Sequence, residues 1–86
     1  MMKLGVLPAP QHTTWAALKA VAQTVDSLGF EHLWVSDHLA APYGSTTGPT
    51  FEAFSVLAAW SLLTKQSRLG TMVVANGFRP PMLTAK

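Results

Sequence analysis

The chain has 86 residues, of which 49% are hydrophobic and 12% are charged. So apolar a composition in so short a chain predicts either an oligomer or a piece of a larger fold, and we favour the second, because a small domain buries little of its surface alone. The net charge of +2 comes from six scattered basic residues, which argues against nucleic acid as a partner, and the lack of cysteine excludes disulfides and thiolate metal sites.

The chain opens with an apolar run, residues 3–7, that stops at a proline as a buried strand does when it leaves a sheet. Residues 14–28 then place apolar side chains at helical spacing. Thr13 or Thr14 can cap the start of this helix, and Gly29 stands where a glycine commonly ends one. The first two elements are therefore a strand and an amphipathic helix.

A second compact apolar run, residues 31–35, ends in polar residues and predicts another buried strand. A loop rich in glycine, serine and threonine covers residues 42–49, and its length is compatible with a functional role. Thr50 can cap a helix over residues 51–64, with Glu52 near the positive end of the helix dipole.

Residues 68–74 form a third β-rich run, and the proline pair after it can open a helix near residue 80. Strands that alternate with helices at this spacing predict a parallel βαβαβ sheet with right-handed crossovers. The first strand is not followed by the G-x-G-x-x-G turn of a dinucleotide-binding sheet. We therefore expect one partial α/β domain over residues 1–86, the N-terminal part of a (β/α)₈ TIM barrel, with marginal stability in isolation.

No segment predicts secretion or membrane insertion. The first apolar run is too short for the core of a signal peptide. The longest later apolar stretch, residues 53–63, falls well short of the ~20 residues that cross a bilayer. We expect a cytoplasmic protein without a membrane partner.

Parallel α/β folds place their sites where strands end, which selects His12, Asp37 with His38, and Asn76 with Arg79. Asp37 and His38 are the best of these, because a histidine can move protons near neutral pH and an adjacent carboxylate can tune or anchor it. The competing interpretation, given equal weight, makes Asp37 a turn residue bonded to backbone amides and leaves His38 in solvent.

Other polar and aromatic residues have simpler interpretations. His12 and Asn76 suit loops and turns, and His32 lies inside a strand where packing is the more common role. Arg79 can pair with a phosphate or carboxylate, or lie on the surface. A metal site of His12, Asp37 and His38 has unfamiliar ligand spacing, so it is disfavoured. Three tryptophans are assigned to core packing: Trp15, Trp34 and Trp60.

Three segments resemble the luciferase-like monooxygenase family. Residues 28–39, LGFEHLWVSDHL, resemble its second-strand signature, residues 52–59 its second helix, and residues 68–86 its third strand and the helix start that follows. The resemblance implies a barrel in which reduced FMN or the deazaflavin coenzyme F-420 lies across the carboxyl-terminal mouth. The parent enzyme is expected to catalyse hydride transfer to, or monooxygenation of, a small organic substrate, and to be a homo-oligomer.

The family's site residues carry over position by position. Asp37 and His38 match a pair near the cofactor ring, with His38 as the proton-transfer candidate and Asp37 as a catalytic and cofactor contact. The Met72–Val73 step matches a non-proline cis peptide against the back of the cofactor, and Asn76 matches an adjoining contact. The segment around Asp37 and His38 favours F-420 modestly over FMN.

In barrels of this kind the phosphate is held by later strands, so the 86-residue chain alone is expected to be inactive. One rival hypothesis is a non-catalytic fragment or interaction module that binds no cofactor. A metal-dependent barrel hydrolase is a second and weaker rival.

Overall fold

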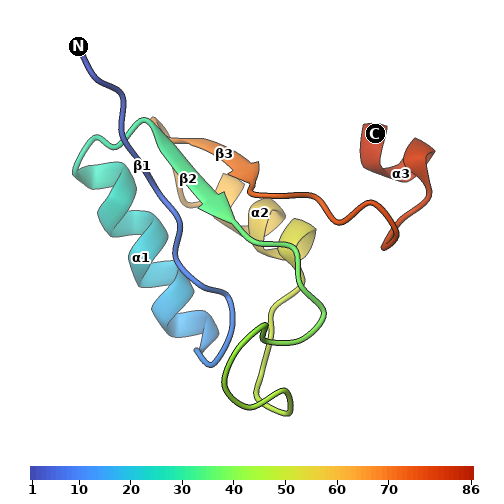
Figure 1. Cartoon of the computed structure of the whole chain (residues 1–86). Coiled ribbons are helices and arrows are strands. Elements are labelled where there is room, and N and C mark those ends of the chain that lie inside the picture. Colours follow the sequence, from blue (N-terminus) through green and yellow to red (C-terminus); the bar gives the residue numbers. More distant parts are fainter.

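A computed structural model describes all 86 residues and contains a three-stranded parallel sheet with helices between the strands (Figure 1). The elements are β1 (Gly5–Val6), α1 (Trp15–Ser27), β2 (His32–Val35), α2 (Ala53–Ser61), β3 (Arg68–Thr71) and α3 (Pro81–Ala85). The strand order is β1-β2-β3, and both neighbouring pairs are parallel. The predicted parallel βαβαβ arrangement is confirmed.

The two outer strands are shorter than the sequence pattern predicts. β1 covers Gly5–Val6 rather than residues 3–7, because it pairs only with the first half of β2. β3 ends at Thr71 rather than at residue 74. The backbone N–H of Met72 still donates to Val35 at 2.9 Å, but β2 ends there and offers no further partner.

The ends of α1 follow the local sequence signals. The N-cap is Thr14, whose hydroxyl accepts a hydrogen bond from the Ala17 amide at 3.2 Å. Gly29 follows the helix with φ of 78°, a left-handed conformation that glycine adopts without a steric penalty. Both predictions about this helix are confirmed.

The start of α2 differs from the prediction, since Glu52 rather than Thr50 is its N-cap. The Glu52 carboxylate accepts from the backbone N–H of Phe54 at 3.2 Å and of Ser55 at 2.7 Å. Thr50 instead forms an isolated antiparallel bridge with Gln11, which holds it in the preceding loop. The prediction that Thr50 caps this helix is wrong because that bridge moves the helix start downstream.

Both long helices pack on the same face of the sheet. Leu33 and Val35 of β2 point toward them, since side chains in a strand alternate between its two faces. The Trp60 indole N–H of α2 donates to the Leu18 carbonyl of α1 at 3.0 Å, which joins the helices directly. The fully buried core is Leu18, Ala22, Val25, Leu33, Val35, Ala53, Val56 and Trp60.

The other face of the sheet carries no helix. Trp34 lies on this face, stacked on His32 with ring centroids 5.5 Å apart. Its indole lies over two glycines on the neighbouring strands, because a Cβ at Gly5 or Gly70 would come within 2.8 or 2.5 Å of it. Trp60 is in the core as predicted, but the assignment of the other two tryptophans to the core is wrong: Trp34 is half-buried on the face without helices, and Trp15, at the start of α1, is 38% exposed.

At the amino end of the sheet a buried carboxylate ties α1 to the loop that enters β3. Asp26 accepts backbone hydrogen bonds from Lys65, Gln66 and Ser67 at 3.0, 2.8 and 2.8 Å. These hydrogen bonds, led by the one from Ser67, lower the pKa of Asp26 below its ordinary value.

α3 lies apart from the sheet, beyond an extended segment (Figure 1). No helix is long and apolar enough to cross a membrane.

Candidate functional site

A concavity of about 240 Å³ lies at the carboxyl ends of the three strands. Segments that follow β1, β2 and β3 all contribute to this carboxyl-end pocket, as expected for a site in a parallel α/β fold. Its lining is Leu7, Pro8, Ala9, Gln11, Ser36, His38, Pro42, Tyr43 and Met72. A larger concavity of about 450 Å³ lies at the opposite end, around residues 1–4 and 28–31, and contains none of the predicted site residues.

The carboxyl-end pocket combines apolar walls with a few polar groups. Leu7 directly follows β1 and Met72 directly follows β3, and both supply apolar surface to the pocket. The buried side chain of Gln11 donates to the Ser36 hydroxyl at 3.2 Å, which links the first and second loops inside the pocket. The imidazole of His38 shares this lining.

Asp37 and His38 are adjacent in sequence, but their side chains point to opposite sides of the sheet. The alternation that turns Leu33 and Val35 toward the helices continues to Asp37, which is buried, while His38 turns to the pocket on the open side. The structure contains no hydrogen bond between these two side chains, and the Asp37 carboxylate is bonded elsewhere.

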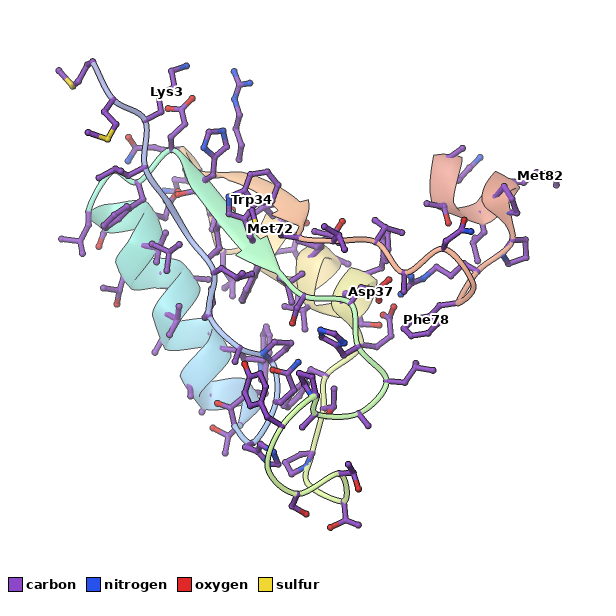
Figure 2. The ribbon with its side chains drawn as sticks, in the orientation of Figure 1. Lys3, Trp34, Asp37, Met72, Phe78 and Met82 are labelled. Atoms are coloured by element: carbon purple, nitrogen blue, oxygen red, sulfur yellow. The ribbon has the colours of Figure 1, made fainter.

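The Asp37 carboxylate forms a bidentate ion pair with Arg79. The guanidinium nitrogens donate to its two oxygens at 2.7 and 2.9 Å, and the Ala75 amide donates to Oδ2 at 2.9 Å. The hydrogen bonds from Arg79 are the main cause that holds the pKa of Asp37 below its ordinary value, against the opposing effect of burial. Figure 2 places Asp37 just beyond the end of β2, beside the segment that leads to Phe78.

Arg79 also pairs with Glu52, the N-cap of α2, and its guanidinium carbon lies 4.2 Å from the centre of the Phe54 ring. Burial acts to raise the pKa of Glu52, but hydrogen bonds from Ser55, Arg79 and the Phe54 amide lower it to about 2. The two carboxylates raise the pKa of Arg79, Asp37 having the larger effect. We call Asp37, Glu52 and Arg79 the ion cluster.

The remaining predicted residues are dispersed. Met72 lines the pocket together with His38, whereas Val73 and Asn76 lie outside that lining and are exposed. The Met72–Val73 peptide bond is cis, as the family resemblance implied. His12 lies outside the pocket: its ring packs against the glycine loop, where a Cβ at Gly48 would come within 2.3 Å of Nδ1.

No group of three His, Cys, Asp or Glu side chains converges as a metal site would require. The set considered from the sequence, His12, Asp37 and His38, is not brought together, because Asp37 faces the helices and His12 packs on a loop. The donor set therefore gives no support to the metal-dependent hydrolase.

Sequence reasoning missed Gln11, Tyr43 and Glu52 as contributors to this end of the sheet. Gln11 and Tyr43 belong to loops whose paths depend on tertiary contacts, and no spacing signal marks them. Glu52 was placed near the start of α2, but its pairing with Arg79, 27 residues away, has no local signature.

The family model of luciferase-like monooxygenases matches residues 2–86. Over 76 residues the chain is 36% identical to 4-hydroxyprotoasukamycin monooxygenase from Streptomyces nodosus subsp. asukaensis. That alignment covers 88% of this chain and 19% of the relative, so the chain spans about a fifth of the length of the curated relative it matches. No solved structure matches the chain.

Proposed function

The chain belongs to the luciferase-like monooxygenase family, and on that premise we propose that it forms part of a flavin-dependent oxidoreductase whose cofactor ring lies at the carboxyl-end pocket. The observation that carries this proposal is the meeting of His38 and Met72 in one pocket. They come from the ends of different strands and were both selected by the family pattern. The pocket also lies where parallel α/β enzymes place their chemistry.

We propose that the chain is the N-terminal portion of a (β/α)₈ barrel. A closed barrel covers the inner face of its sheet and pairs every strand edge, whereas here no helix covers the face that carries half-buried Trp34, and β1 and β3 have one neighbour each. The sequential strand order and the helices on one face also suit a barrel wall. The relative's much greater length leaves room for the remaining strands.

The pocket fits the ring of a flavin-type cofactor better than its phosphate. Flat apolar rings bind where apolar walls meet a few directed polar groups, which here are Gln11, Ser36 and His38. No lysine or arginine lines the pocket, and the nearby Arg79 is paired with two carboxylates. Met72 forms part of the wall, and exposed Val73 and Asn76 would extend it.

When bound, such a cofactor supplies hydride transfer or, in reduced flavin, the activation of oxygen. His38 would hold or move a proton beside the ring, since imidazole can donate or accept one near neutral pH. Gln11 and Ser36 would orient polar groups of the ring or substrate. Asp37, bonded to Arg79 and Ala75, would hold the end of β2 instead of touching the reactants.

Two cofactors are consistent with these residues. The relative is named as a monooxygenase, so we favour FMN and the monooxygenation of a small organic substrate. The alternative is hydride transfer by F-420, which the segment around Asp37 and His38 favours. Both cofactors require the same pocket.

The proposal is tested by titrating the isotope-labelled chain with FMN and with F-420 while backbone NMR signals are followed. We expect saturable shifts at Gln11, Ser36, His38 and Met72, with Gly29 at the opposite end unchanged. Inorganic phosphate is the control, because no lysine or arginine lines the pocket to hold it. Shifts that phosphate reproduces, or that concentrate around Gly29, would contradict the proposal.

A non-catalytic interaction module is the second candidate, and the uncovered face around Trp34 is the observation that favours it. Such a module would bind neither cofactor, and it would fold cooperatively by itself. The same titration, combined with a thermal melt, separates the two functions.

A further inference from the structure

No member of the ion cluster lines the carboxyl-end pocket. The cluster's members come from three places: Asp37 follows β2, Glu52 begins α2, and Arg79 lies in the segment between β3 and α3. We propose that Arg79 is a positioning residue that fixes the two sides of the cofactor pocket, His38 and Met72, relative to each other. This inference rests on the proposed function for what the pocket binds.

Arg79 is linked to both sides of the pocket through its bonds to Asp37. Asp37, held by both guanidinium nitrogens, directly precedes His38 in the chain, so fixing Asp37 on the helix side directs His38 to the open side. Asp37 also accepts from the amide of Ala75, three residues after Met72. The exits of β2 and β3 are thereby tied together beyond the last backbone bond of their ladder.

The burial of the Arg79–Asp37 pair favours positioning over bulk stability. The side chains of Arg79 and Asp37 are only 13% and 3% exposed. Removing such charges from water costs about as much as their attraction returns, so a buried ion pair is weak evidence for stability. We therefore assign this pair to fixing the local geometry. Arg79 also pairs with Glu52 at the amino end of α2, where the positive end of the helix dipole disfavours a cation that lacks carboxylate partners.

The geometry requires arginine specifically. The guanidinium donates to both Asp37 oxygens, pairs with Glu52 and lies over the Phe54 ring at the same time. A lysine ammonium keeps the charge, but it lacks the planar fork and stacks less well. Arg79→Lys therefore changes the geometry while conserving the charge.

The experiment compares Arg79→Lys and Asp37→Asn with a matched control, Asp26→Asn. Asp26 is also buried and also accepts three hydrogen bonds, but it lies at the amino end of the sheet. Each chain is labelled with ¹³C-methyl methionine, and the Met72 signal is assigned by Met72→Leu. Thermal melts establish that each variant is folded, and FMN titration gives its affinity.

We expect both cluster variants to displace the Met72 methyl signal and to weaken FMN binding about tenfold, which corresponds to about 1.4 kcal/mol. Asp26→Asn is expected to lower the melting temperature with the Met72 signal and FMN affinity unchanged. A folded Arg79→Lys chain with an unmoved Met72 signal would overturn the inference, as would equal effects from Asp26→Asn.

The two proposals fail in different ways. If the unaltered chain binds neither FMN nor F-420, the proposed function fails, while the Met72 signal still decides whether Arg79 positions the pocket. If Asp37→Asn does not fold, Arg79→Lys provides the decisive comparison. If FMN binds equally well to the unaltered and Arg79→Lys chains, the pocket binds the ring without the positioning role.

Discussion

Trp60→Phe is expected to destabilise the chain strongly, because Trp60 joins the two helices over one face of the sheet. The side chain is fully buried, and its indole N–H donates to the Leu18 carbonyl at 3.0 Å. Losing that hydrogen bond costs about 1 kcal/mol, and the space left by the smaller ring costs about 1 to 2 kcal/mol more. For a domain of this size, the sum predicts a fall in Tm of roughly 10 to 20 °C.

The assay is urea and thermal unfolding followed by far-UV circular dichroism. The matched control is Trp15→Phe, since Trp15 is 38% exposed and its replacement should cost less than about 0.5 kcal/mol. Equal shifts in the two variants would refute the packing of α1 and α2 on a common face. A larger effect at Trp15 would refute it as well.

Two further predictions concern charge and close packing. The pKa of Glu52 is lowered from 4.5 to about 2 in the folded chain, so its stabilising contribution is complete above pH 4.5 and is lost as the pH falls toward about 2. Glu52→Gln should therefore reduce the dependence of the unfolding free energy on pH across this interval. Urea unfolding at a series of pH values measures that dependence, and an unchanged dependence in the variant would contradict the prediction. A Cβ at Gly70 would come within 2.5 Å of the Trp34 ring, whereas one at Gly77 meets nothing within 4 Å; Gly70→Ala should therefore cost about 1 to 3 kcal/mol and Gly77→Ala little, and similar melting temperatures for the two would argue against the seating of Trp34.

The features of the fold that depend on near neighbours could be predicted from the sequence. Thr14 and Gly29 act within one turn of the helix they bound, so their signals are local and were sufficient. The order of strands and helices followed from the same kind of pattern. Thr50 misled because a bridge to Gln11, from a distant loop, competes with its capping role.

The candidate site was predictable only in part, because its partners are far apart in the chain. Position at a strand end and the family pattern selected His38 and Met72, which do share a pocket. For Arg79 the sequence does not distinguish an ion pair from a surface position, since nothing near it in sequence identifies Asp37, 42 residues away, as its partner. The separation of Asp37 from His38 follows from strand alternation and could have been anticipated by extending β2 by three residues.

The central claim is that the carboxyl-end pocket binds a flavin-type ring beside His38. Its most direct test is a fluorescence titration of FMN and F-420 with the chain, with His38→Ala and with His32→Ala as the matched histidine outside the pocket. We predict saturable binding of at least one cofactor that is weakened by His38→Ala and retained by His32→Ala. Binding that is insensitive to His38→Ala, or no binding of either cofactor by the folded chain, would contradict the claim.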